Sequence, residues 1–398
     1  MKLRTLLIAC VIGLFANSVF ADKKPLKVFI LVGQSNMQGH AQVRTLAHIG
    51  MDKKTAPILR EIQDDDGTPR VHKEVWISYL SHGDVKQGQL TTGFGADDNK
   101  IGPELTFGIY MQKQLNEPIL IIKTAWGGKS INTDFRPPSA GPYKFNENQI
   151  EQFKKQKKDL KEIKAKKAEA TGHYYRLMMD HVKKVLADTK SVYPKYDPKQ
   201  GHELAGFVWF QGWNDMVDRG TYPTRDKPGG YDKYSEVMAH FIRDVRKDLG
   251  APKMPFVIGV IGVGGPTSKY SPSQMRYKAV HQNIRDAMAA PASMAEFKGN
   301  VAAVRTENYW DPQLKELGEK WEQVRAKSRS LSKDKTLTRE QRKTALDTFT
   351  AATMSEKDLA IYKAGTSNAG YHYLGSAKIM AGIGKGFAEA LANISKKR

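Results

Sequence analysis

A serine closely follows the apolar run Leu26–Val32. The letters GQSNM at residues 33–37 come directly after Leu26–Val32, and they place Ser35 where a buried strand would end. A serine hydroxyl at such a point can attack a carbonyl carbon, and backbone N–H groups at a helix start can stabilise the oxyanion that forms. Serine and glycine also suit an ordinary helix cap, so this segment alone leaves both interpretations open.

Three further segments could complete a site for acyl transfer. Gly127 and Gly128 follow another apolar run, and a glycine pair lets the backbone approach a ligand closely. Gln211 and Asn214 follow a third run and carry amide groups that can donate hydrogen bonds to an oxyanion. His372 precedes the last helical pattern, and histidine is the usual base for a serine nucleophile.

An ordered set of strands must position these segments. Short, nearly continuous apolar runs predict buried parallel strands, and helical patterns lie between them. Such alternation predicts a three-layer α/β/α sandwich around a mostly parallel sheet of about five strands, with sites at the carboxyl edge. The strand runs are Leu26–Val32, Val75–Leu80, Pro118–Ile122, Ala205–Phe210, Pro255–Ile261 and Asn300–Arg305; the helical patterns are Pro103–Leu115, His173–Asp188, Tyr231–Leu249, Ser273–Ala290 and Ser376–Ile394.

Two charged segments interrupt the alternation. Asn146–Ala170 and Asp311–Tyr362 are helix-prone and rich in Lys and Glu, as solvated helices are. Neither has the Gly/Ser composition of a flexible linker. We therefore expect one domain over residues 22–398 that carries two helical insertions, near 146–170 and 311–362.

The first residues have the pattern of an export signal over residues 1–21. Lys2 and Arg4 precede the apolar stretch Leu6–Phe15, and small residues lead to a predicted cleavage after Ala21. The stretch is short for a membrane span, although an uncleaved anchor or a lipoprotein signal at Cys10 are alternatives. We expect an exported protein, either periplasmic or extracellular.

Composition narrows the chemistry and the partners. Cys10 is the only cysteine, so the chain after residue 21 offers no thiol nucleophile, disulfide or cysteine-bound metal. The formal net charge of +21 suits acidic polysaccharide, membrane headgroups or nucleic acid. Apart from the run Lys154–Lys167 the basic residues are spread out, and no nucleic-acid motif accompanies them. We expect a solvated surface or attraction to an anionic glycan, with no nucleic-acid partner and no stable membrane insertion.

Taken in order, the polar segments resemble a known family. Residues 33–37 resemble the first block of the carbohydrate-esterase branch of the SGNH hydrolases, which includes sialate O-acetylesterases and the acetylxylan esterases of carbohydrate esterase family six. Residues 127–131 resemble its second block and residues 211–215 its third, while His372 occupies the fifth. The Gly-Pro-Glu at 102–104 is also seen in this branch. The resemblance covers most of the chain apart from the two charged segments.

The resemblance implies a flavodoxin-like SGNH fold and a serine esterase that removes O-acyl groups, with acetyl expected, from carbohydrate. Ser35 would be the nucleophile and His372 the base. The backbone N–H groups of Ser35 and Gly128, with Gln211 or Asn214, would hold the oxyanion. No metal and no organic cofactor is implied. Trp126 and Trp213 follow strand ends, where they could form a wall for the sugar or pack in the core.

One departure from the family pattern concerns the acid that orients the histidine. The family has Asp three residues before the histidine, but here that position is Ala369, with Asn368 beside it. A backbone carbonyl could hold the imidazole, or an acid could come from Glu307 or Asp311; we take Glu307 as the candidate. A third possibility is that the protein has lost catalysis and is a relative of the family that only binds carbohydrate. An SGNH lipase or thioesterase is a further alternative, although the sequence between the blocks is polar.

Overall fold

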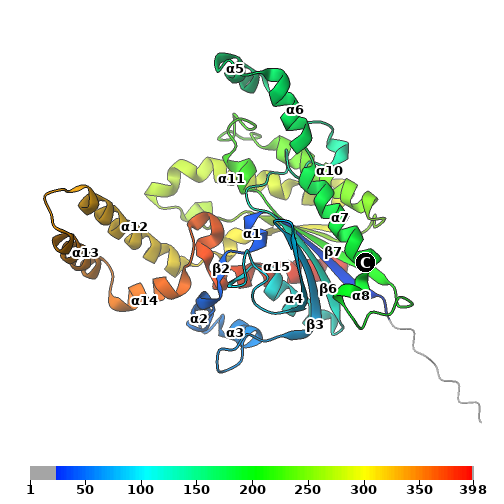
Figure 1. Ribbon diagram of the computed structural model, residues 1–398, viewed down its shortest axis with the longest axis horizontal. Coiled ribbons are helices and arrows are strands. Elements are labelled where there is room, and N and C mark those ends of the chain that lie inside the picture. Colours follow the sequence, from blue (N-terminus) through cyan, green and yellow to red (C-terminus); the bar gives the residue numbers. More distant parts are fainter. Residues whose placement is uncertain (1–23, 397–398) are drawn as a thin grey trace, which may run out of the picture.

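The computed structural model describes residues 24–396, so the predicted export signal lies outside the described residues. A seven-stranded sheet in the order β4-β3-β6-β1-β7-β8-β9 forms the centre of the molecule (Figure 1). Every neighbouring pair runs parallel except β3 and β4. The strands are β1 (Leu26–Gly33), β3 (His72–Ser81), β4 (Asp84–Leu90), β6 (Ile119–Ala125), β7 (His202–Phe210), β8 (Phe256–Val260) and β9 (Val301–Arg305).

This architecture confirms the predicted three-layer α/β/α sandwich, but the sheet has seven strands where about five were expected. All six apolar runs form strands of the sheet. The additional strand is β4, whose sequence DVKQGQL is polar and mostly exposed. It pairs with β3 as an antiparallel edge hairpin, and an edge strand facing solvent gives no apolar run to detect.

Parallel pairing brings the polar segments together. Gly33 at the end of β1 pairs with Ala125 of β6 and with Phe210 of β7. The segments that follow these three residues therefore leave the sheet side by side at its carboxyl edge. Only glycine fits at position 33, because a Cβ there would lie 2.1 Å from the carbonyl oxygen of Phe210.

Helices cover both faces of the sheet because side chains alternate along each strand. Trp209 of β7 packs on Phe241 of α10, and α10 in turn contacts α11. Phe210 points to the opposite face and packs on Phe387 of α15, which lies against α4 (Figure 1). The main covering helices are α4 (Glu104–Leu115), α7 (His173–Ala187), α10 (Asp232–Asp248), α11 (Lys278–Ala289) and α15 (Ala377–Ser395).

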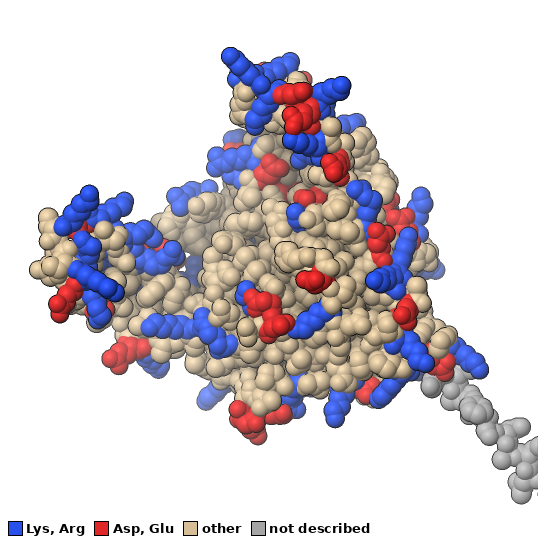
Figure 2. Space-filling view, viewed as in Figure 1, with Lys and Arg blue, Asp and Glu red and all other residues tan. Residues whose placement is uncertain are grey.

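The two charged segments form helices that project from this body (Figure 1). The first holds α5 (Glu147–Lys155) and α6 (Leu160–Ala170); the second holds α12 (Pro312–Lys333), α13 (Arg339–Thr353) and α14 (Glu356–Gly365). Figure 2 shows Lys and Arg gathered on both projections, while the surface between them is mostly uncharged. Within residues 24–396, no helix is both long and apolar enough to cross a membrane.

A buried ion pair lies beneath the Ser35 segment. The Lys123 ammonium on β6 contacts the Glu104 carboxylate of α4 at 2.7 Å, and neither side chain is exposed. The ammonium also donates to the carbonyl oxygens of Gln38, at 2.9 Å, and Phe94, at 2.7 Å. All of its donors are therefore used, and one of them holds the residues that follow Ser35.

Lys123→Met should lower the free energy of unfolding by roughly 3–5 kcal/mol, because it leaves the Glu104 carboxylate buried without a partner. Urea unfolding followed by circular dichroism measures the change. The matched control is Lys113→Met, since Lys113 pairs with Glu61 at 2.6 Å on the surface and such pairs contribute about 1 kcal/mol or less. Equal losses in the two variants would contradict this account of Lys123.

Candidate active site

Ser35 is the first residue of α1 (Ser35–Gln38), a single helical turn that follows β1 directly. Its side chain is only 7% exposed. The glycine pair of the next loop lies against it, because a Cβ added at Gly127 would sit 3.9 Å from the Ser35 Cβ. Gly128 has a left-handed backbone, φ +73°, with open space beside it. A substrate can therefore approach the backbone at Gly128 without meeting a side chain.

Gln34 connects the serine loop to the amide loop after β7. Its Oε1 accepts from the backbone N–H of Gly212 at 3.0 Å and from Gln211 Nε2 at 3.2 Å. Its Nε2 donates to Asn214 Oδ1 at 3.2 Å. Because Oδ1 is the acceptor in that bond, the Nδ2 group of Asn214 is turned away from Gln34 and can serve another acceptor.

The two candidate oxyanion amides differ in their remaining hydrogen-bonding capacity. Gln211 is 2% exposed, and its Nε2 donates to Lys129 O at 3.0 Å and to Asp215 Oδ2 at 2.7 Å as well as to Gln34. Asn214 is half-buried, and its Nδ2 has no acceptor among residues 24–396. The oxyanion role proposed for Gln211 therefore has no support in these contacts, whereas Asn214, which Gln34 joins to the serine loop, has a free donor.

Asn214→Ala should lower kcat roughly 100- to 1,000-fold with a smaller change in KM, because an oxyanion donor acts mainly on the transition state. Steady-state kinetics on an acetylated sugar measure both constants. The matched comparison is Gln211→Glu, which keeps the size of the side chain but places a second carboxylate beside Asp215. Its main effect should be a lower unfolding temperature rather than a lower kcat. A rise in KM alone for Asn214→Ala would show that the amide only holds the substrate.

Asp215 binds the two loops together. Its fully buried carboxylate accepts from the backbone N–H of Ile131 at 2.8 Å and of Asn132 at 3.2 Å. Gln211 Nε2 and the Tyr222 hydroxyl, at 2.9 Å, complete its partners. Burial raises the pKa of Asp215 to about 6, while its four donors favour the ionised form. Asp215 thus fixes the glycine loop relative to the amide loop without reaching a substrate.

His372 lies on the loop before α15, and an amide holds its ring. The imidazole Nδ1 is 3.1 Å from Asn368 Oδ1, and that oxygen also accepts the backbone N–H of Ala369 at 2.7 Å. The Ala369 N–H is a fixed donor, so it determines which end of the amide faces the ring. An acceptor oxygen requires a proton on Nδ1 of His372, which leaves Nε2 unprotonated and able to accept a proton.

A strained backbone supports this loop. Tyr373 and Leu374 both have a left-handed backbone, with φ +53° and +61°. Tyr373 is fully buried, and its hydroxyl accepts the Gly262 N–H at 2.7 Å and lies 2.6 Å from Thr306 Oγ1. Consecutive non-glycine residues of this kind persist only where packing enforces them, and they gather at functional sites. The buried tyrosine thus anchors His372 at the sheet edge.

His40 stacks on His372. The ring centroids are 4.0 Å apart and the planes 2° from parallel. Burial, followed by the charge of Lys100, lowers the pKa of His372 from 6.5 to about 4. Burial and the neighbouring His372 likewise lower the pKa of His40 to about 4. Both rings therefore stay neutral as the pH falls from 6.5 toward about 4.

The acid limb of the pH–kcat/KM profile should consequently fall well below pH 6.5, near the pKa of about 4 of His372. The sign follows from the role of a base, which acts only when neutral, because a lowered pKa keeps the neutral form populated as the pH falls. Initial rates on 4-nitrophenyl acetate between pH 3.5 and 8 measure the limb. A midpoint at or above 6.5 would contradict the prediction.

The carboxylates proposed to orient His372 have other partners. Glu307 Oε2 is 3.1 Å from the Arg285 Nε, so our assignment of Glu307 as the orienting acid has no support in these contacts. Asp311 caps α12 through Leu314 N at 2.8 Å and pairs with Lys378 at 2.7 Å. Both acids follow β9 as expected, but each is used to hold a helix or loop in place.

The two tryptophans of the site loops have different environments. Trp126 is 4% exposed and packs against Phe135 and Tyr174, so it belongs to the core and cannot form a sugar wall. Trp213 is half-buried, and its ring centroid lies 5.6 Å from that of Tyr371. The Tyr371 ring centroid in turn lies 4.5 Å from that of His372. Of these two tryptophans, only Trp213 can contribute an aromatic surface near the site.

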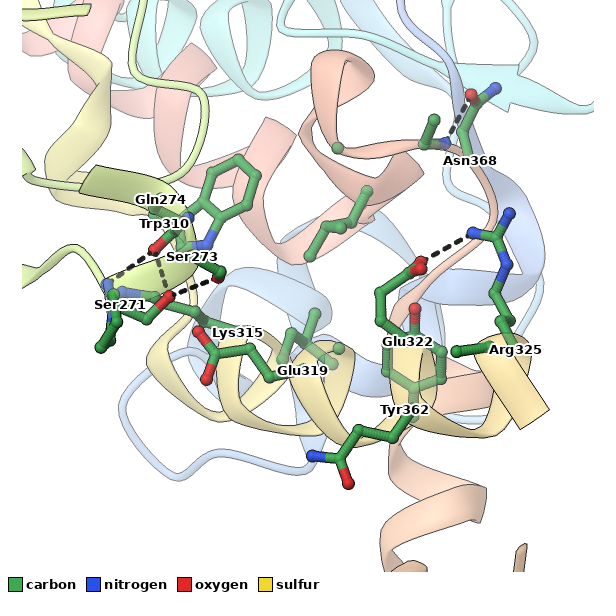
Figure 3. A pocket seen from close by; sticks show the side chains of 18 residues that line it. Ser271, Ser273, Gln274, Trp310, Lys315, Glu319, Glu322, Arg325, Tyr362 and Asn368 are labelled. Atoms are coloured by element: carbon green, nitrogen blue, oxygen red, sulfur yellow. Dashed lines mark hydrogen bonds and ion pairs between the residues drawn. The ribbon is translucent and has the colours of Figure 1, made fainter. Parts of the chain in front are cut away.

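A cleft of about 780 Å³ is lined in part by the histidine loop (Figure 3). Asn368, Ala369 and Gly370 line it together with Trp310 and residues of α12. In Figure 3, Asn368 lies at one end of the cleft and Glu319 and Glu322 project from the α12 ribbon along its floor. The charged insertion at 311–362 therefore forms a wall beside the loop that carries His372.

Comparison with known proteins assigns the family. A model of the carbohydrate esterases described as sialic acid-specific acetylesterases matches residues 25–309. The chain belongs to this family. It is therefore a carbohydrate esterase, a hydrolase of carboxylic esters, and the resemblance seen in the sequence is confirmed. A search of curated proteins finds no match.

Two solved structures are similar to this esterase. A protein of Arabidopsis thaliana is 16% identical, with a TM-score of 0.40, and the match covers 71% of this chain and 86% of that protein. A carbohydrate acetylesterase of Xanthomonas citri is 14% identical, with a TM-score of 0.39, and the match covers 70% of this chain and 49% of that one.

Proposed function

We propose that this protein is an exported carbohydrate O-acetylesterase in which Ser35 is the nucleophile and His372 the base. The observation that carries the proposal is the contact between His372 Nδ1 and Asn368 Oδ1, because it leaves Nε2 free to accept a proton. The close approach of Gly127 to Ser35 and the hydrogen bond from Gln34 to Asn214, which join the three loops, support the same assignment. The family supports an acylated carbohydrate as the substrate.

The reaction proceeds through an acyl-enzyme. His372 Nε2 takes the proton of the Ser35 hydroxyl as Oγ attacks the acyl carbon, and the carbonyl oxygen becomes an oxyanion. Backbone N–H groups of Ser35 and Gly128 and the Asn214 Nδ2 group stabilise that oxygen. The imidazolium then protonates the departing sugar oxygen, and the ester passes to Ser35. Water, deprotonated by the same Nε2, then attacks this ester. Nε2 returns that proton to Ser35 Oγ as the C–O bond to serine breaks, which releases acetic acid and the free Ser35 hydroxyl.

Asn368 takes the orienting role that an acid fills in the family pattern. Its amide oxygen selects the Nδ1–H tautomer and fixes the ring, as a carboxylate would. It carries no charge, so it stabilises the imidazolium less than a carboxylate would. This agrees with the lowered pKa of His372.

Acetate release tests the proposal. The wild type is assayed on 4-nitrophenyl acetate and on acetylated sugars beside Ser35→Ala and His372→Ala, with circular dichroism to confirm folding. Activity in the wild type and background rates in both variants are expected. A folded wild type that releases no acetate from any of these, nor acid from longer-chain esters, would instead favour a carbohydrate-binding relative.

The export part of the proposal is supported by the pattern in residues 1–21. Fractionation of cells that express the full chain tests it. The protein is expected outside the cytoplasm with a new N-terminus at Asp22, and intact chain retained in the cytoplasm would contradict it.

A further inference from the structure

A second cleft, of about 750 Å³, opens beside the catalytic loops. We call it the arginine cleft and define it by six of its lining residues: Arg219, Arg225, Arg276, Trp213, Tyr277 and Tyr371. Trp213 precedes the oxyanion amide Asn214, and Tyr371 precedes His372. The arginine cleft therefore begins where the reacting part of a substrate would lie.

The charged side chains that line the arginine cleft are all positive. Three arginines line it, and no Asp or Glu does so among the residues that the structure describes. Arg225 donates to the Met216 carbonyl at 2.8 Å and is used within the fold. Arg219 and Arg276 are exposed, and neither has an ion-pair partner within residues 24–396. Two guanidinium groups thus remain available to an anion, which they bind in bidentate fashion.

The cleft of Figure 3 provides the contrast. Its lining includes two basic residues, Lys315 and Arg325, and two acidic ones, Glu319 and Glu322, all on α12, and Arg325 contacts Glu322 at 2.7 Å. Its charges are therefore balanced within the protein. Of these two clefts, only the arginine cleft has positive charges that no acidic residue of its lining balances, so an anionic ligand would complement it.

Aromatic surface accompanies the free arginines. Tyr277 is 44% exposed and Tyr371 45% exposed, so both rings present surface to solvent in the cleft. The Arg276 guanidinium lies 4.7 Å from the centre of the Tyr277 ring, so the cation and the ring share one wall. Aromatic rings pack on the apolar faces of sugars, while guanidinium groups recognise carboxylate and sulfate.

We infer that the arginine cleft is a subsite for a sugar unit that carries a carboxylate or a sulfate group, adjacent to the acylated unit at Ser35. The placement of the acylated unit rests on the proposed function. The substrate is then an anionic polysaccharide bound over at least two sugar units. Net charge alone predicts attraction to any polyanion, whereas this cleft predicts binding at two named arginines.

The test measures binding without hydrolysis. The full chain is titrated calorimetrically with deacylated hexamers of galacturonic acid, of a sulfated glucan and of xylose, at physiological salt. An anionic hexamer should bind more tightly than the neutral one. The double variant Arg219→Gln/Arg276→Gln should weaken its binding by about 10- to 100-fold, since each charge-assisted contact contributes about tenfold or more.

The matched control removes the same charge elsewhere. Arg329→Gln/Arg339→Gln changes two exposed arginines of α12 and α13, outside the arginine cleft, and should weaken binding at most about twofold as a screened long-range effect. Equal weakening in both double variants, or xylose bound as tightly as the anionic hexamers, would overturn the inference. The hexamer that binds identifies carboxylate or sulfate. Because no ester is cleaved, a failure of acetate release would contradict the proposed function alone.

Discussion

Ser35→Ala and His372→Ala should each lower kcat by roughly a millionfold, and the double variant should lose no more than either single one. In the proposed mechanism the two side chains perform one proton-coupled step, so removing either abolishes the whole step. The rate that remains comes from the oxyanion donors at Gly128 and Asn214 and from substrate binding, which both variants keep. The measurement is acetate release at saturating substrate, with trace wild-type enzyme excluded by separate purification.

The double variant distinguishes this mechanism from a simpler one. If Ser35 and His372 acted independently, their losses would multiply, and the double variant would be far slower than either single one. His40→Phe is the control, because it keeps an aromatic ring stacked on His372 and removes no group from the proposed proton path. A millionfold loss in that variant would show that the wrong histidine had been assigned as the base.

Asn368→Ala should lower kcat by about a thousandfold, because the imidazole then loses the acceptor that fixes its tautomer and orientation. In the wild type, Asn368 Oδ1 is held toward Nδ1 by the backbone N–H of Ala369. Without it, the ring can turn or carry its proton on Nε2, and neither form can accept the Ser35 proton. Steady-state kinetics on 4-nitrophenyl acetate measure the loss.

The informative companion variant is Asn368→Asp, which keeps the geometry and adds a charge. It should raise the pKa of His372, because a carboxylate favours the imidazolium, and shift the acid limb of the pH profile upward. A kcat at or above that of the wild type is expected at pH 8. If Asn368→Ala and Asn368→Asp both behave like the wild type, the amide does not orient the base.

Much of the fold was accessible from the sequence because buried parallel strands are apolar throughout. The runs at Leu26–Val32 and Ala205–Phe210 could be assigned from composition alone, and their order implied the shared carboxyl edge. The strand β4 was missed because it lies at an exposed edge and its sequence is polar. The helical character of both charged segments was predicted, but their charge pattern carries no information on the direction in which they project.

The sequence predicts a site residue where the residue type alone indicates the role. It does not do so where the role depends on which atoms are in contact. Asn368 stood beside the missing acid in the sequence, but only the structure shows its oxygen at Nδ1 of His372. Gln211 and Asn214 have the same functional group, and only their hydrogen bonds show that the Gln211 amide is already used within the protein while the Asn214 Nδ2 group is free. Trp126 was indistinguishable from Trp213 until burial was known, because both follow strand ends.

The histidine loop and α15 form the last part of the described chain, while Ser35 follows its first strand. α15 is held against the rest by the Thr106 hydroxyl, which donates to Ala381 O at 2.8 Å, and by Ala377 N–H, which donates to Thr45 Oγ1 at 3.0 Å. A growing chain that has already formed β1 and the serine turn still lacks His372, the base of the proposed mechanism. Under that mechanism, ester hydrolysis begins only after synthesis has passed residue 372 and α15 has docked, so chains that end before residue 372 are inactive.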